Sequence, residues 1–244
     1  ADRARSIDEA VYGPVPRHFI ELPYAIGTQG FNGHRSYAAG AFLAQGDFVA
    51  FLDDDNWFDS EHIASLMAPV LHEGAEWSYS LRRVWSADGE VSIPDNGHSL
   101  GHWPTAYNDE IHLIDTNCYL LRRDIAARMS HLWNSRYPDT NAHIGGHSIM
   151  SPDFMICMQL LKEYPAYSSN RRYTVNYTAG STEYSTTLES IRKLNALSEQ
   201  RYGNDLPWLD LTIEQAHASS ASSGPPAATH AKANGRDARE SAAS

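Results

Sequence analysis

The sequence predicts an α/β protein with a mixed, mostly parallel sheet that is flanked by helices. Apolar residues at helical spacing occupy residues 35–45, and Gly46 then leads into an unbroken apolar run at Phe48–Leu52. Such a run predicts a strand that is buried on both faces, as in a parallel sheet. Three aspartates at 53–55 follow it directly. They should therefore lie at the carboxyl edge of the sheet, where α/β proteins bind their ligands.

The three adjacent carboxylates, Asp53, Asp54 and Asp55, predict a metal and phosphate site. Like charges repel one another, so the cluster lowers stability unless a cation neutralises it. Mg²⁺ suits this role because it takes only one or two protein carboxylates and completes its shell with phosphate oxygens. The alternative interpretation is a solvated acidic turn. An EF-hand loop is excluded, because Phe58 stands where its glycine is required.

Composition limits the class of protein and its partners. The 244 residues are 42% hydrophobic and 20% charged, which indicates one large globular domain or two small ones. The net charge of −11 argues against nucleic acid as a partner, but not against a nucleotide. Cys118 and Cys157 lie in apolar surroundings, which favours buried reduced thiols and a cytoplasmic protein. No membrane span or signal peptide is visible.

The residues before the acidic run carry weaker signals. The sequence predicts at most one short helix in residues 1–17 and a short strand at His18–Leu22. The glycines of residues 27–33 predict a flexible turn that lacks the spacing of a dinucleotide motif and the lysine of a P-loop. Arg35 would lie in the first turn of the following helix, either on the nucleotide side or as an ordinary surface arginine.

After the aspartates, Ser60 can cap a helix that ends at Gly74. Alternation at Trp77–Leu81 predicts a half-buried strand, and a hairpin turn follows at residues 87–89. Residues 92–110 contain several glycines and prolines and few apolar anchors, which predicts a long loop.

A further strand is predicted at His112–Leu121, interrupted by the polar residues Asp115, Thr116 and Asn117. Polar groups inside an apolar run either hydrogen-bond to nearby backbone or face a pocket. Asp124 caps the helix predicted to follow.

The last third of the chain predicts a helix, a strand and another helix. Ser151-Pro152-Asp153 combines a cap, a proline and an acid, which together mark a helix start. Asp153 could merely complement the helix dipole there. A strand is predicted at Tyr173–Tyr177, and apolar spacing predicts a final helix that ends at Gly203.

Three of these segments together resemble the family 2 glycosyltransferases, which have the GT-A fold. The first is NGHRSYAAGAFLAQGDFVAFLDDDNW at residues 32–57, the second DTNCYLLRRD at 115–124, and the third SPDFMICMQLLKEYP at 151–165. Their order and spacing also match, and the resemblance covers residues 20 to about 200.

The resemblance implies inverting transfer of a sugar from a nucleotide-sugar donor to a carbohydrate or other hydroxyl acceptor, with Mn²⁺ or Mg²⁺ as the cofactor. It implies that the acidic cluster binds the ribose and the metal on the diphosphate. The metal ligands would be Asp55 and Asp53, and the nucleotide-sugar-binding residues would be Arg35, Asp53, Asp54, Asp115 and Asn117. It also implies that Asp153 is the general base.

The resemblance implies that residues 1–215 form the glycosyltransferase domain, without the first strands of its nucleotide-binding half. The composition of residues 216–244, which is rich in Ala and Ser, predicts a disordered tail. Two alternatives to the glycosyltransferase remain. A nucleotidyltransferase of similar fold should show a Gly-rich opening loop with a Lys or Arg, which is missing. The acidic cluster and Asp153 argue against a non-catalytic carbohydrate- or nucleotide-binding domain.

Overall fold

The computed structural model describes Ile20 and residues 33–134, 143–144, 147–148, 152–180 and 186–210. The predicted helix in residues 1–17, the strand at His18–Leu22 (apart from Ile20) and the tail at 216–244 lie outside these residues. The described helices are α2 (His34–Leu43), α3 (His62–His72), α4 (Arg123–Trp133), α5 (Pro152–Glu163), α6 (Leu188–Tyr202) and the 3₁₀ turn η1 (Thr116–Cys118).

Six strands form one mixed sheet. They are β1 (Phe48–Ala50), β2 (Trp57–Phe58), β3 (Trp77–Trp85), β4 (Ser92–Pro94), β7 (Tyr119–Arg122) and β10 (Tyr167–Thr178). Their order is β1-β7-β3-β10-β2, with β4 paired to β3. Two separate hairpins complete the described strands, β5 (Pro104–Thr105) with β6 (Asn108–His112) and β8 (His143–Ile144) with β9 (His147–Ser148).

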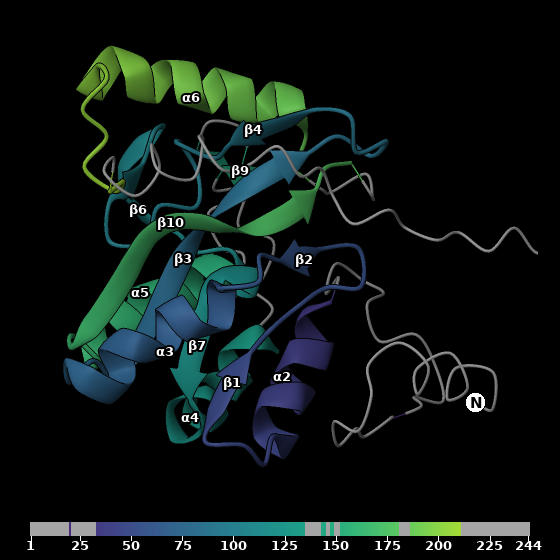
Figure 1. Cartoon of the computed structure of the whole chain (residues 1–244), viewed down its shortest axis with the longest axis vertical. Coiled ribbons are helices and arrows are strands. Elements are labelled where there is room, and N and C mark those ends of the chain that lie inside the picture. The colour runs from purple at the N-terminus through teal and green to yellow at the C-terminus, as the bar shows by residue number, and fades with distance from the viewer. Residues whose placement is uncertain are drawn as a thin grey trace, which may run out of the picture.

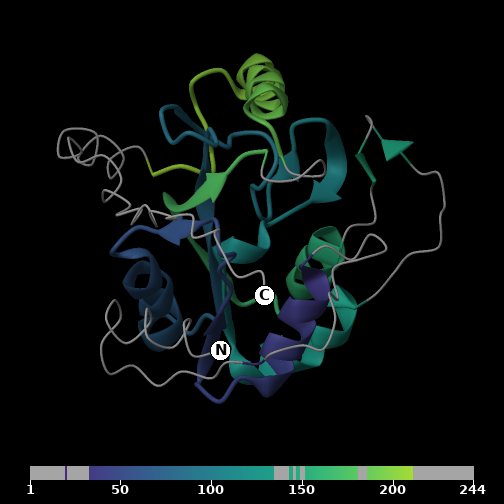
Figure 2. The same cartoon turned by 90° about the vertical axis from the view of Figure 1, so that its right-hand side faces the viewer.

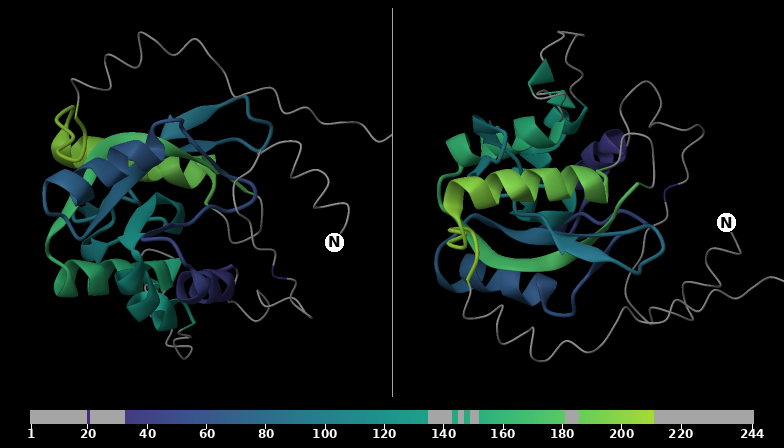
Figure 3. Two further views of the ribbon diagram at one scale, coloured as in Figure 1. Left: turned by 60° about the horizontal axis from the view of Figure 1, so that its bottom comes forward. Right: turned by 90° about the horizontal axis from the view of Figure 1, so that it is seen from above.

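Helices cover both faces of this sheet, which confirms the predicted α/β fold. Helix α3 packs on one face, and α2, α4 and α5 lie together on the other (Figures 1 and 2). Helix α6 crosses above the end of the sheet that carries β4 (Figures 1 and 3). It packs Ile191 and Leu194 against Val84 of β3.

Strands β1, β3 and β10 run in one direction, whereas β7, β4 and β2 run in the other. The sheet is therefore mixed, as predicted. Because β7 enters between β1 and β3 and is antiparallel to both, only β3 and β10 are parallel neighbours among the described strands. Strand β10 includes the strand that was predicted at Tyr173–Tyr177.

Strand β3 is the centre of the sheet, and its predicted half-burial is wrong. The polar residue Ser78 is as fully buried as its apolar neighbours Trp77 and Tyr79. The Ser78 hydroxyl donates to the carbonyl of Leu66 in α3, 2.7 Å away. Trp77 and Tyr79 belong instead to the core that includes residues of α4 and α5. Helices on both faces therefore bury a strand whose alternating pattern indicated one wet face.

Strand β1 is less buried than predicted, whereas β3 is more buried. Val49 and Phe51 are buried, but Ala50 is exposed and Leu52 is 48% exposed. In the described part of the chain only β7 pairs with β1, so β1 is an edge strand. Its open side borders a groove of about 590 Å³, which α2 lines with residues that include Tyr37 and Gly40. The predicted burial of Phe48–Leu52 on both faces is therefore wrong.

Three other local predictions need correction. The strand predicted at His112–Leu121 is divided, because η1 separates β6 from β7. The loop predicted at residues 92–110 contains β4, β5 and the start of β6. Helix α4 begins at Arg123, so Asp124 lies in its first turn rather than at its cap. By contrast, Gly203 ends α6 as predicted.

The close approach of Gly101 to Tyr79 yields a stability prediction. Gly101 has φ +72°, and a Cβ there would lie 2.2 Å from the Tyr79 ring, whereas a Cβ on Gly89, with φ +73°, would meet nothing within 4 Å. We expect Gly89→Ala to cost about 1 kcal/mol of unfolding free energy and Gly101→Ala roughly 3 kcal/mol, because the second also overpacks the core. Urea denaturation measures both, and equal losses would contradict the described packing.

Candidate active site

The acidic segment crosses the end of the sheet. Strand β1 lies at one edge of the sheet and β2 at the other, so residues 51–56 pass from edge to edge. Thr178, at the end of β10, donates its hydroxyl to the Asp55 carbonyl, and its backbone N–H donates to Asn56 Oδ1 at 2.8 Å. Turn η1 lies at the same end, because β7 pairs Leu120 with Ala50 in antiparallel register.

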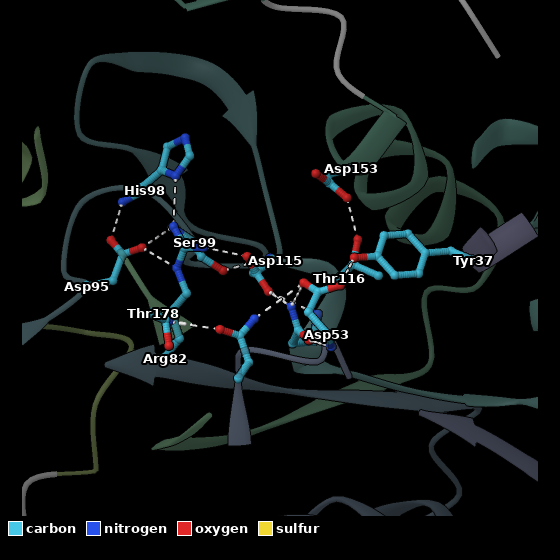
Figure 4. Close-up of polar contacts among 12 residues, drawn as sticks. Tyr37, Asp53, Arg82, Asp95, His98, Ser99, Asp115, Thr116, Asp153 and Thr178 are labelled. Carbon is cyan, nitrogen blue, oxygen red and sulfur yellow. Dashed lines mark hydrogen bonds and ion pairs between the residues drawn. The ribbon is translucent and has the colours of Figure 1, made fainter. Parts of the chain in front are cut away.

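Asp53 is held by donors from three segments (Figure 4). The Tyr37 hydroxyl of α2 donates to Asp53 Oδ1. The amide of Asn117 in η1 donates to Asp53 Oδ2 at 2.9 Å, and its Oδ1 accepts the Asp53 backbone N–H at 2.7 Å. Asn56 donates to Oδ2 at 3.3 Å. A carboxylate offers about four acceptor positions, so these three donors leave one on Oδ1.

Burial and the neighbouring carboxylates shape the protonation of this group. Burial raises the pKa of Asp53, the Asn117 and Tyr37 hydrogen bonds lower it, and the charges of Asp115 and Asp55 raise it again; the net direction is upward. Burial, with the charge of Asp53, also raises the pKa of Tyr37 far above its usual range. The phenol therefore stays protonated and remains a donor to the carboxylate.

Asp115 connects Asp53 to a buried ion pair in the centre of the sheet (Figure 4). The Asn117 Nδ2 amide that bonds Asp53 also donates to Asp115 Oδ1 at 2.9 Å. Arg82 of β3 donates from Nη1 to Asp115 Oδ2 and from Nε to Asp95 Oδ2, the latter at 2.9 Å. Asp95 is fully buried and also accepts the backbone N–H groups of residues 97–99.

The Arg82 guanidinium stays charged although only 3% of its side chain is exposed. Burial alone would lower its pKa, but the charges of Asp115 and Asp95 outweigh this and raise it. The same pairing holds the pKa of Asp95 below its ordinary value, against the opposite effect of burial. The Tyr177 ring, 4.7 Å from the guanidinium carbon, adds a cation–π contact.

Asp153 lies in the first turn of α5, as predicted, and its side chain is 27% exposed. Thr116 of η1 donates its hydroxyl to Asp153 Oδ1 (Figure 4), and His34 Nε2 of α2 lies 3.5 Å from Oδ2. Burial would raise the pKa of Asp153, but the bond and charge of His34 and the Thr116 bond lower it. The carboxylate is therefore ionised at neutral pH.

Asp54 and Asp55 are exposed at the turn that follows Asp53. Among the described residues, no three His, Cys, Asp or Glu side chains converge to hold a metal ion unaided. Asp55 nevertheless fits a cation whose remaining ligands are phosphate oxygens and water, because its carboxylate faces solvent at the end of a strand. Asp53 fits less well as a ligand, since protein donors already use most of its acceptor positions.

The predicted site residues lie in one region, but their partners were missed. Asn117 donates hydrogen bonds to both Asp53 and Asp115. Asp153 is linked to this group through Thr116, which lies between Asp115 and Asn117 in the chain. Arg35 is half-buried in the first turn of α2. The residues that sequence reasoning missed are His34, Tyr37, Arg82, Asp95 and Thr116. Two signals were available: the Arg82-Arg83 pair in the otherwise apolar and small-residue strand β3, and Thr116, which the sequence showed as a polar interruption of a strand but which was not assigned to the site.

Comparison with known proteins adds one finding. Residues 24–117 match the model of a family described as Glycosyl transferase family 2. This span includes α2, the acidic segment and η1 up to Asn117, and it ends before Asp153. No curated protein matches the chain significantly. No helix in the described ranges is long and apolar enough to cross a membrane. Cys118 and Cys157 are buried free thiols, as predicted.

The buried Arg82 network yields a second stability prediction. We expect Arg82→Met to lower the free energy of unfolding by about 3–5 kcal/mol, because it leaves Asp95 and Asp115 without their countercharge. The control is Arg122→Met, which removes an arginine that is 54% exposed and pairs with Asp124 at 3.4 Å. This exposed pair should contribute at most about 1 kcal/mol. Similar losses in the two variants would show that the buried network does not stabilise the fold.

Proposed function

We propose that this protein transfers a sugar with inversion from a nucleotide-sugar donor to an acceptor hydroxyl, with Mn²⁺ or Mg²⁺, as the match of residues 24–117 to the family 2 glycosyltransferases suggests. One observation carries this proposal. Asp53 follows β1 and Asp153 opens α5, and adjacent residues of the same 3₁₀ turn, Asn117 and Thr116, hydrogen-bond to them. The carboxylate proposed to bind the donor and the carboxylate proposed as the base are thereby held by neighbouring residues of one turn.

In this proposal the acidic segment binds the donor. Asp55 would hold the cation, with Asp53 beside it, and Asp53 and Asp54 would hold the ribose. Asp115 and Asn117 would line the pocket for the donor sugar, and Arg35 would contribute on the nucleotide side. When bound, the cation would supply positive charge to the diphosphate as this group leaves. The exposure of Asp55 and the last acceptor position on Asp53 support these roles.

Asp153 would act on the acceptor. Its carboxylate would take the proton from the acceptor hydroxyl while that oxygen bonds to the anomeric carbon, on the face opposite the departing diphosphate. The bond between the anomeric carbon and the diphosphate oxygen breaks in the same step. The lowered pKa of Asp153, caused by His34 and Thr116 against the effect of burial, supports this role because a base must be ionised.

We also infer a cytoplasmic location. The two thiols of Cys118 and Cys157 are buried and reduced, and burial raises the pKa of each well above its ordinary value. Such cysteines carry no structural disulfide, which suits a reducing compartment. Fractionation of cells that make the protein would test the location directly.

The cation site can be tested by ligand-dependent unfolding. With Mn²⁺ and the right member of a UDP, GDP and dTDP panel, the wild-type unfolding midpoint should rise by several degrees, because ligand binds only the folded state. Asp55→Asn should remove most of this rise and leave the midpoint without ligand nearly unchanged. Asp47→Asn is the control, since Asp47 precedes the same strand at its other end and is also exposed. If Asp55→Asn keeps the full rise, Asp55 does not hold the cation.

The base can be tested by hydrolysis of nucleotide sugars, in which water replaces the acceptor hydroxyl. Asp153→Asn should lower turnover by roughly 10²–10⁴-fold and leave the donor KM nearly unchanged. Asp124→Asn is a matched control, because Asp124 lies in the first turn of α4 with 58% of its side chain exposed. Both changes should cost about 0.3–1 kcal/mol through the helix dipole. Wild-type turnover in Asp153→Asn would show that Asp153 is not the base and has only a structural role at the start of α5.

A further inference from the structure

The two central carboxylates share the same two supports. Helix α2 contributes Tyr37 to Asp53 and, one turn earlier, His34 to Asp153. Turn η1 supports the same two carboxylates with neighbouring residues. Asn117 donates to Asp53, and Thr116 donates to Asp153. No part of the proposed chemistry uses Thr116 directly, although its hydroxyl bonds the proposed base.

Thr116 itself is held firmly. It is 4% exposed, and η1 is closed by a hydrogen bond from the Cys118 N–H to the Asp115 carbonyl at 2.8 Å. Asp115 Oδ1 accepts the Asn117 N–H at 2.9 Å, which caps the turn. The Asp115 N–H in turn donates to Ser99 Oγ at 2.8 Å. The hydroxyl of Thr116 is therefore presented from a rigid backbone rather than from a free loop.

We propose that Thr116 is a positioning residue for Asp153, whose carboxylate it holds by one oxygen so that the other oxygen is directed toward the acceptor hydroxyl. The inference rests on the proposed function, in which Asp153 is the base. An aspartate that loses this bond can rotate about its side-chain torsions, and a misplacement of about 1 Å can cost roughly 10²-fold in rate. Because Asn117 binds Asp53 independently of Thr116, donor affinity should not change.

Several ionisable groups could also affect the protonation of Asp153. Thr116 and His34 contact its carboxylate directly, and electrostatic effects couple it to Tyr37, Arg82, Tyr119 and Cys157. Burial raises the pKa of the Tyr119 hydroxyl and of the Cys157 thiol well above neutrality, so both stay uncharged. The pKa of Asp153 is therefore governed by burial, His34, Thr116 and the distant Arg82 charge. Loss of the Thr116 hydroxyl should raise it.

The experiment compares Thr116→Val, which keeps the shape and removes the hydroxyl, with Thr116→Ser, which keeps the hydroxyl and removes the methyl group. With the nucleotide sugar that the wild type hydrolyses fastest, and Mn²⁺, we expect Thr116→Val to lower kcat about 10²-fold. The donor KM should stay within about twofold, because the change does not touch Asp53. Thr116→Ser should recover most of the lost kcat. A packing role would instead harm Thr116→Ser at least as much as Thr116→Val, and that result would overturn the proposal.

A second measurement separates this inference from the proposed function. Carbon-detected NMR titration of Asp153 in the full chain should show a higher pKa in Thr116→Val than in wild type, and a nearly unchanged pKa in Thr116→Ser. Full turnover in Asp153→Asn, or no hydrolysis of any donor, would refute the proposed function while the titration still reports on the Thr116–Asp153 bond. An unchanged pKa in Thr116→Val, or wild-type kcat in that variant, would refute the inference itself.

Discussion

The fold depends on how one buried positive charge is neutralised. Arg82 lies on the central strand, and a guanidinium there must be paired within the protein because water cannot reach it. Asp95, just after β4, and Asp115, just before η1, supply the two negative charges. These pairs join two connections on either side of the β5–β6 hairpin to the middle of the sheet. The position of η1 follows from this requirement.

Turn η1 in turn positions the carboxylates of Asp53 and Asp153, to which its residues donate hydrogen bonds. Strand β7 begins directly after it and pairs with both β1 and β3, so the turn lies where β1 ends while β3 continues. From this position, Asn117 reaches Asp53 and Thr116 reaches Asp153. Helix α2 closes the arrangement from the opposite side with Tyr37 and His34. The backbone of η1 therefore joins the hydrogen bonds that neutralise Arg82 to the hydrogen bonds that hold the two carboxylates of the proposed chemistry.

The sequence predicted the elements of this site better than their assembly. Local signals were sufficient for α2, for the acidic segment and for the start of α5, because caps, apolar spacing and charge lie within a few residues of one another. The pairing of β7 between β1 and β3 depends on contacts across about 70 residues, such as Val49 with Leu121, and no local pattern encodes it. The burial of β1 and β3 was therefore assigned incorrectly.

The partners of the predicted residues were missed for the same reason. Asp95 lies in a Pro-Asp-Asn-Gly sequence that is typical of an exposed turn, yet it is fully buried because it receives Arg82. The helix pattern placed Arg35 in the first turn of α2 and the resemblance gave it a binding role, whereas His34 and Tyr37 are the residues that reach the carboxylates. Which side of a helix faces a site depends on the tertiary structure, so the sequence pattern of α2 alone could not distinguish these residues.

The hydrogen bonds to Asp53 have a consequence for the order of events in a reaction cycle. Tyr37, Asn117 and Asn56 donate hydrogen bonds that hold the Asp53 carboxylate and partly offset the repulsion from its acidic neighbours. Protein groups therefore hold Asp53 in place, and in the proposed function a cation at Asp55 would contribute little to folding. Such an ion would be free to arrive with the nucleotide and to depart with the diphosphate. The metal would then behave as part of the substrate rather than as a permanent part of the protein.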